Sequence, residues 1–282
     1  MLRQEIMSET GLSRKALEYY EEQGCIQPIR RENGYRDYSF KDLAVLKQIK
    51  AYRILGLSLY QIQKILASKS GTPLQGQILR DLDIKVEQDT RKKSILKQIL
   101  LGAKIEDYAE DLILLEGEET IYEKLCQIFP GYLGQLLFIN YQPFFNEPVN
   151  DQEALTLYIQ FLDQLPAFEL DEKEKRFLEE SSQEVTYDQL QKINQDKLKA
   201  VKDFQKWQEE NEDWIEKYMS YKESPEYLNH PMAQISNKMK QYFEENQYYD
   251  KAIPLIRKFS ASYDKYYQSL IQADQLFLKK YK

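Results

Sequence analysis

The distribution of glycine constrains this chain more than any other feature of its sequence. All ten glycines lie at or before Gly134, and the 148 residues that follow contain none. Hairpin turns need residues that adopt positive φ, and glycine supplies them most often, so a β-rich domain of that length is not expected. The C-terminal half is therefore predicted to be helical. Its helices should meet at prolines such as Pro143, Pro166 and Pro231.

Length and composition predict a globular protein of about two domains. The chain has 282 residues, of which 30% are charged and 42% hydrophobic. No apolar run approaches the roughly 18 residues that span a bilayer, and Arg3, Glu5 and Glu9 interrupt the N-terminus where a signal peptide would be apolar. With only Cys25 and Cys126, a disulfide framework is not expected. We expect a reduced, cytoplasmic protein without a membrane partner.

The net charge of −7 conceals an asymmetry between the two ends of the chain. Residues 1–70 contain 12 Lys and Arg against 8 Asp and Glu, whereas the remainder contains 27 against 38. A nucleic acid responds to the field within about one Debye length, so the sign of the local segment matters more than the total. A basic head on an acidic body is compatible with DNA binding by the head.

The first 70 residues predict a winged helix-turn-helix. Ser13 is placed as the N-cap of a helix over residues 14–22, and Gly24 ends that helix. Asn33-Gly34, a strong hairpin signal, predicts a two-stranded wing. Two further helices are predicted by capping pairs, Ser39 with Asp42 and Ser58 with Gln61.

The helix over residues 14–22, here the reading helix, is expected to enter the major groove of duplex DNA, while the wing contacts the phosphate backbone. The candidate DNA-binding residues are Ser13, Arg14, Lys15, Tyr19, Tyr20, Arg30, Arg31, Asn33, Gly34, Tyr35, Arg36 and Tyr38. Glu18, Glu21 and Glu22 also belong to the reading helix and would repel phosphate unless they face away or pair with neighbouring arginines.

A series of motifs in this head resembles the MerR family of transcription regulators in order and spacing. The motifs are Thr10-Gly11-Leu12-Ser13, Tyr19-Tyr20-Glu21, Gly24, Pro28, Asn33-Gly34-Tyr35-Arg36, Tyr38-Ser39, Asp42-Leu43 and Leu55-Gly56-Leu57-Ser58-Leu59. The resemblance covers about the first 70 residues, and the C-terminal part is not recognised. Two positions depart from the pattern: Glu18 stands where the family usually has Arg, and Cys25 where it commonly has Leu.

The resemblance implies a winged head, an antiparallel coiled-coil homodimer and a variable C-terminal effector domain. It also implies binding to double-stranded promoter DNA at a palindromic site, which the protein bends and untwists. RNA polymerase would then engage the reshaped promoter, which makes the polymerase an indirect partner. The physical basis is deformation energy supplied by protein contacts, with an effector shifting the favoured DNA shape.

The segment that follows the head predicts a linker and then a long helix over residues 77–115. Its apolar seam runs at three- and four-residue steps through Leu82, Val86, Leu96, Leu100 and Ala103, with Asp89 and Lys93 as interruptions. A helix of that length would extend roughly 55 Å, beyond any single small domain. We therefore expect an antiparallel coiled coil in a homodimer. The alternative is a helix buried against its own C-terminal domain.

Residues 118–282 are predicted to form an all-helical effector domain, with another long helix over residues 186–222. Aromatic residues number 29 from Tyr108 onward, and such side chains line pockets for hydrophobic or cationic compounds. The candidate ligand-binding residues are Tyr141, Phe144, Phe145, Trp207 and Trp214. The alternatives are that these aromatic residues only form a core, that this domain binds a protein partner without a ligand, or that the chain has lost DNA binding altogether.

The sequence offers little for metal, cofactor or catalytic chemistry. Cys25, Cys126 and His230 are too far apart to predict a metal site in one chain, although two Cys126 thiolates meeting across a dimer are an alternative. No HExxH motif, glycine-rich phosphate loop or Ser/His/Asp triad occurs. We expect no metal, no cofactor and no enzymatic activity. The predicted fold class is mainly α, with domains at residues 1–70, 77–115 and 118–282.

Overall fold

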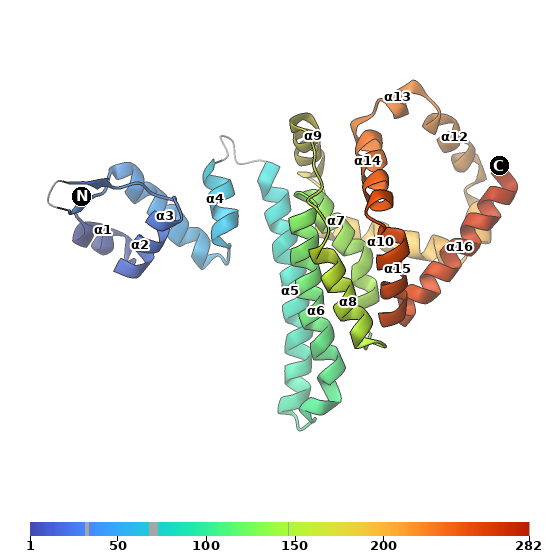
Figure 1. Ribbon diagram of the computed structural model, residues 1–282, viewed down its shortest axis with the longest axis horizontal. Coiled ribbons are helices and arrows are strands. Elements are labelled where there is room, and N and C mark those ends of the chain that lie inside the picture. The colour runs from blue at the N-terminus through green and yellow to red at the C-terminus, as the bar shows by residue number, and fades with distance from the viewer. Residues whose placement is uncertain (32–33, 68–72, 146, 282) are drawn as a thin grey trace. The chain divides into compact units, whose positions relative to one another are not determined.

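The computed structural model describes residues 1–31, 34–67, 73–145 and 147–281. Helices account for 79% of the structure, which confirms the mainly-α prediction. The chain divides into two compact units, Met1–Leu74 and Gln75–Lys282, which we call the head and the body (Figure 1).

The head consists of helices with a two-stranded wing inserted after the second helix. Its elements are α1 (Arg3–Thr10), α2 (Arg14–Glu22), β1 (Ile29–Arg30), β2 (Arg36–Asp37), α3 (Phe40–Ile54) and α4 (Leu59–Ala67). The strands pair antiparallel, with Ile29 opposite Asp37 and Arg30 opposite Arg36. Asn33, half of the predicted Asn-Gly turn, lies outside the described residues, whereas Gly34 has the expected positive φ of 81°.

The predicted helix caps of the head are present. Ser13 Oγ accepts from the backbone N–H of Ala16 at 3.2 Å, and Ser39 and Asp42 form a reciprocal capping box. Helices begun in this way pack their apolar faces together, and α1 and α4 both lie against α3. The side chains that form this small core are fully buried: Ile6, Leu17, Leu46, Ile49 and Ile62.

The body is built from helices alone within its described residues. Its elements are α5 (Pro73–Leu100), η1 (Ile105–Tyr108), α6 (Ala109–Ile128), α7 (Tyr132–Tyr141), η2 (Gln142–Phe145), α8 (Gln152–Asp163), α9 (Glu172–Ser182), α10 (Tyr187–Lys202), α11 (Phe204–Glu210), α12 (Glu212–Lys222), α13 (Pro225–Leu228), α14 (Pro231–Glu245), α15 (Tyr248–Phe259) and α16 (Ala261–Tyr281). None of these helices has both the length and the apolar character needed to cross a bilayer.

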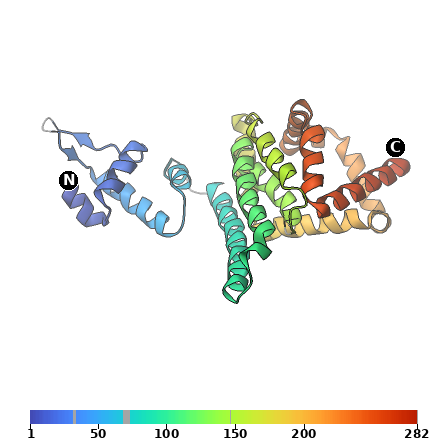
Figure 2. The same cartoon turned by 60° about the horizontal axis from the view of Figure 1, so that its bottom comes forward.

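The prediction of a single helix over residues 77–115 is wrong at both ends of the helix. Helix α5 already begins at Pro73, whose fixed φ suits the first helical position, and it ends at Leu100. Gly102 then adopts a φ of 106°, which lets the chain reverse its direction, and α6 returns alongside α5 (Figures 1 and 2). The segment is therefore a helical hairpin.

The helix expected over residues 186–222 is divided into α10, α11 and α12. The breaks fall at Asp203, with φ −132° and ψ 61°, and at Asn211, with φ −122° and ψ 18°. Asp and Asn side chains compete with the helix for backbone groups and favour such breaks. The chain bends at these points, and α10 and α11 both pack against α16.

The core of the body lies between α6, α7, α8 and α15. Its large side chains are almost fully buried: Phe129, Phe138, Phe145, Tyr158 and Phe259. Helices α6 and α7 approach so closely that a Cβ atom on Gly134 would lie 2.8 Å from the Cα atom of Cys126. The last glycine of the chain is thus explained by helix packing.

Candidate nucleic-acid interface

Helix α2 buries one face in the head and exposes the other. Leu17 is 0% and Tyr20 8% exposed, so this side of the helix belongs to the core. Lys15, Tyr19 and Glu22 are exposed. They share the opposite side of the helix, because residues three, four and seven positions apart lie on one helix face. This outward face can enter a groove without disturbing the packing of the head.

Cationic side chains extend from α2 and from the wing. Arg14 is 69% exposed in the first turn of α2, and Arg30 and Arg31 are 72% and 52% exposed in the wing, where Arg31 also pairs with Asp37. Within the described part of the head, no carboxylate forms an ion pair with Lys15. Exposed guanidinium and ammonium groups are the groups that neutralise phosphates.

Two acidic residues of α2 pair with arginines from three different segments. Glu18 Oε1 accepts from Arg14 Nε at 2.9 Å and lies 3.5 Å from Arg3 Nη1. The hydrogen bond from Arg14 is the main cause of the lowered pKa of Glu18. The sequence left open whether these acids face away or pair, and the structure shows pairing.

Glu21 joins the reading helix to the wing. It accepts a hydrogen bond from Arg36 Nε and another from Arg30 Nη2 at 3.4 Å. The side chains of Glu21 and Arg36 are only 17% and 23% exposed, so this ion pair is partly screened from solvent. The contact raises the pKa of Arg36 and leaves its guanidinium only partly available to phosphate. The sequence left open that Glu21 pairs with an arginine, but it did not identify Arg36, which lies 15 positions away.

The aromatic candidates of the head divide into an exposed pair and a buried pair. Tyr19 is 48% and Tyr35 65% exposed, and both are accessible to a partner. Tyr20 and Tyr38 are 8% and 2% exposed, and they serve the core of the head. Sequence spacing alone could not separate the two pairs. Ser13, another candidate, is the N-cap of α2, and its side chain accepts a hydrogen bond from the backbone N–H of Ala16.

Helix α5 presents two opposite faces, which correspond to the two alternatives drawn from the sequence. One face is buried against the body, with Arg80 and Ile84 each 1% exposed. The other carries exposed apolar side chains at intervals of a heptad repeat, and these are Leu79 at 60%, Val86 at 63%, Leu96 at 55% and Leu100 at 77%. Of the predicted seam, Leu82 is half-buried, and Ala103 lies beyond the end of the helix.

The buried face of α5 is held by polar contacts that the sequence did not predict. Arg80 donates to Gln135 Oε1 at 2.8 Å and to the carbonyl oxygens of Ser182 and Val185 at 2.7 Å. Near the other end, Arg91 pairs with the fully buried Glu118 at 2.5 Å. Burial raises the pKa of Glu118 to about 7, even though Arg91 opposes that shift. Charged residues on helices usually lie on a solvated face, so the sequence alone does not predict that Arg80 and Glu118 are buried.

The candidate ligand-binding residues fall into two groups within the body. Tyr141, Phe144 and Phe145 lie in the core, where Phe144 and Phe145 are 6% and 1% exposed. Trp207 and Trp214 come together at 6.2 Å between ring centroids, and no ring contact joins the two groups within the described residues. The tryptophans belong to a row of four rings, here called the aromatic row: Phe204, Trp207, Trp214 and Tyr218.

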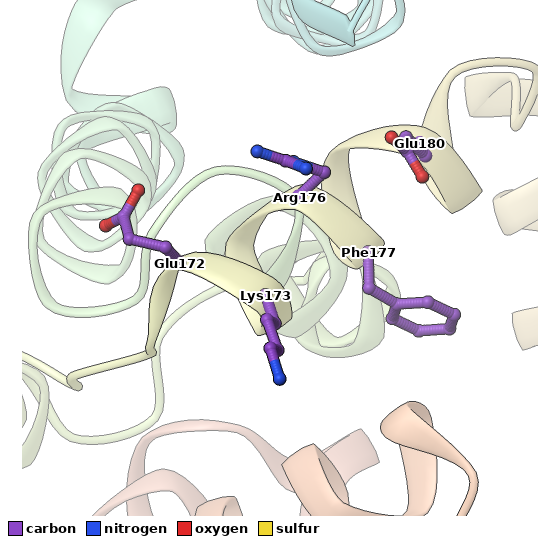
Figure 3. Close-up of a pocket in the computed structure, with 5 residues that line it drawn as sticks. All are labelled: Glu172, Lys173, Arg176, Phe177 and Glu180. Atoms are coloured by element: carbon purple, nitrogen blue, oxygen red, sulfur yellow. The ribbon is translucent and has the colours of Figure 1, made fainter.

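A shallow hollow beside α9 was not predicted. It has a volume of about 220 Å³ and is lined by Glu172, Lys173, Arg176, Phe177 and Glu180 (Figure 3). In Figure 3, Lys173 and Arg176 extend to opposite sides of α9. None of the predicted ligand-binding residues lines it. Among the described residues, no three His, Cys, Asp or Glu side chains are grouped closely enough to hold a metal ion.

Comparison with known proteins identifies relatives of the head and of the segment just after it. Residues 4–69 match the model of a MerR HTH family regulatory protein. The chain is 30% identical over 104 residues to the HTH-type transcriptional regulator HmrR of Rhizobium leguminosarum bv. viciae, a match that spans 34% of this chain and 81% of HmrR.

Two further relatives match over similar or shorter lengths. The mercuric resistance operon regulatory protein of Bacillus cereus is 34% identical over 97 residues, which is 34% of this chain and 74% of that protein. The regulator CueR of Salmonella typhi is 41% identical over 56 residues, 20% of this chain and 41% of CueR. No solved structure matches the chain at a significant level. The C-terminal region remains unrecognised.

Proposed function

This chain belongs to the MerR family of DNA-binding transcriptional regulators, and we propose that it binds a palindromic promoter site as a homodimer. The observation that carries the proposal is the arrangement of α2 and the wing in the head. The outward face of α2 presents Lys15 and Arg14, and the wing adds Arg30 and Arg31. Such a module inserts α2 into the major groove while the wing contacts neighbouring phosphates.

The proposed dimer rests on the exposed face of α5. Leu79, Val86, Leu96 and Leu100 are each more than half exposed although they are apolar. Because the opposite face of α5 already packs on the body, a second copy of the chain is the partner that a heptad-spaced seam of this kind fits. Two heads joined through such a seam would contact two half-sites of one duplex.

Regulation would follow from the shape of the bound DNA. A dimer that holds two successive half-sites can bend and untwist the base pairs between them, at a cost supplied by its contacts. RNA polymerase would then respond to the reshaped promoter without direct contact to this protein. Bacterial promoters lie in the cytoplasm, and the protein would act there.

The aromatic row is the proposed site for a small effector. Trp214 and Tyr218 stack at 5.1 Å with their planes 7° apart, and they are 54% and 40% exposed. Acidic residues lie on the same helices, among them Glu210, Asp213 and Glu216, and the ammonium group of Lys222 already lies 5.9 Å from the centroid of the Tyr218 ring, as a cationic ligand would. A flat aromatic cation fits this combination of ring faces and negative charge.

A selection experiment tests the proposed function. Purified full-length protein is incubated with a library of random duplexes, and the bound duplexes are sequenced. We expect a two-fold symmetric motif with a fixed half-site spacing. A motif without symmetry, or no enrichment at all, would contradict the proposal.

A titration tests the effector site separately. N-methylquinolinium should quench the tryptophan fluorescence, whereas its neutral isostere 2-methylnaphthalene should do so less, and Tyr218→Ala should weaken the effect. Tyr221→Ala, which removes a ring outside the aromatic row, serves as the control. A flat titration with both compounds would favour a body that binds a protein partner.

A further inference from the structure

Glu18 occupies an unusual place for an acidic side chain in a DNA-binding head. It lies one helical turn after Arg14 and one helical turn before Glu22, which is exposed on the outward face. A carboxylate in that position meets the negative potential of the groove walls. Its pairing with Arg14 and Arg3 offsets part of this repulsion, and a hydrogen-bond donor on the DNA would offset more of it.

The contacts of Glu18 leave one of its oxygens available. Oε1 receives both the hydrogen bond from Arg14 and the ion pair from Arg3. Within the described part of the head, Oε2 makes no further hydrogen bond or ion pair. The lowered pKa keeps the carboxylate ionised near neutral pH, so that Oε2 can only accept a hydrogen bond.

The chemistry of the major groove restricts what an acceptor can read. Only two groups donate there, the N4 amino group of cytosine and the N6 amino group of adenine, and carboxylates pair with the first. Arginine pairs with guanine O6 and N7. Arg14 and Glu18 lie side by side on one helix face, which suits a C·G pair or two adjacent C·G pairs.

We propose that Glu18 determines base preference by accepting a hydrogen bond from cytosine N4 in each half-site, while Arg3 and Arg14 hold its carboxylate in place. The proposal rests on the function proposed above, because it requires that α2 enter the major groove. It gives a physical role to Glu18, which stands where the MerR family usually has Arg. It also separates Glu18 from Glu22, which ends α2 and lies farther from its N-terminal reading turn.

The test repeats the duplex selection with Glu18→Gln and with Glu22→Gln, which make the same change of charge. We expect the wild-type motif to favour cytosine at one position of each half-site by about tenfold. Glu18→Gln should lose that preference or exchange it for adenine, since an amide side chain pairs with adenine N6 and N7. All other positions of the motif should stay unchanged, and Glu22→Gln should keep the cytosine.

The outcomes distinguish the two proposals. A wild-type motif that is identical in Glu18→Gln would overturn the role of Glu18 and leave the proposed function intact. A cytosine preference lost equally in Glu22→Gln would assign the effect to net charge and would also overturn it. If the wild-type protein selects no motif, the proposed function fails, and the role of Glu18 fails with it.

Discussion

The guanidinium of Arg80 on α5 donates a hydrogen bond of 2.7 Å to the carbonyl oxygen of Ser182 at the end of α9. A second bond of 2.7 Å reaches the carbonyl oxygen of Val185 just beyond it. The last carbonyls of a helix have no partner within the helix, and a cation there also complements the helix dipole. Arg80 therefore fixes the first turns of α5 to the end of α9.

Replacing Arg80 with Met should destabilise the body by about 2 kcal/mol, because two backbone carbonyls and Gln135 Oε1 would lose their donor. The two tryptophans of the chain, Trp207 and Trp214, both lie in the body, so that their fluorescence during urea unfolding reports on this unit. Lys251→Met, at an exposed lysine of α15 away from the seam of α5, is the control. Equal stability of the two variants would show that the buried charge costs as much as its bonds contribute.

Gly76 makes a second close contact at the same place. A Cβ atom on Gly76 would lie 2.5 Å from the carbonyl oxygen of Gln183, a distance that real Cβ atoms do not adopt. Because the obstacle is backbone, Gly76→Ala should force α5 and the residues after α9 apart and lower the free energy of unfolding by about 2 kcal/mol. The same urea experiment measures it. A variant as stable as wild type would show that the backbone at Gln183 shifts to accommodate the Cβ atom at little cost in free energy.

The buried Glu118 predicts a pH dependence of stability. Its folded-state pKa is raised from 4.5 to about 7, so the folded protein binds this proton more tightly than the unfolded chain does. Its contribution is therefore fully present below the unfolded pKa and is lost as the pH rises through about 7. Relative to wild type, Glu118→Gln should gain about 2 kcal/mol of stability between about pH 5 and about pH 8.

Urea unfolding of both proteins across this pH range measures the difference. Glu119→Gln is the control, since Glu119 is the exposed neighbour of Glu118 on α6. A constant difference between wild type and Glu118→Gln would show that Arg91 keeps the carboxylate ionised in the folded state.

Lys15 is expected to contact phosphate. Lys15→Ala should weaken binding to all duplex sequences to a similar degree and reduce the slope of log affinity against log salt by about one. Lys251→Ala, at an exposed lysine of α15 in the body, is the control for loss of a positive charge. If Lys15→Ala changed the preferred sequence and kept the salt slope, this residue would read a base.

Much of the head could be predicted from local sequence signals. Ser13, Ser39 and Gly34 act within a few residues of themselves, and each has the cap or turn geometry expected of it. The pairing of Glu21 with Arg36 could not be predicted, because it depends on how the wing folds back onto α2. The burial of Tyr20 and the exposure of Tyr19 likewise follow from packing.

The body was less predictable, for two physical reasons. Gly102 reverses the chain after α5, yet a single glycine inside a helical pattern is often tolerated. Arg80 and Glu118 are buried although both are charged, and only their partners in the folded chain make that possible. Packing in the folded chain likewise decides which aromatic candidates are buried: Phe144 and Phe145 lie in the core, whereas Trp214 is 54% exposed.

The proposed dimer can be tested by a change on the exposed seam. Val86→Glu would place a charge on the apolar face of α5 without touching the body, since Val86 is 63% exposed. It should convert the dimer into a folded monomer, as measured by sedimentation equilibrium. Leu157→Glu, at a 44% exposed leucine of α8, should remain dimeric. If both variants kept the dimer, the contact would lie elsewhere.

The composition of the protein–DNA complex tests the central claim most directly. Sedimentation equilibrium gives the number of 33.7 kDa chains bound to one duplex that carries the selected site. We predict two chains on the complete palindrome and much weaker binding to a duplex with a single half-site. One chain per duplex, with equal affinity for the half-site and the complete palindrome, would contradict the account.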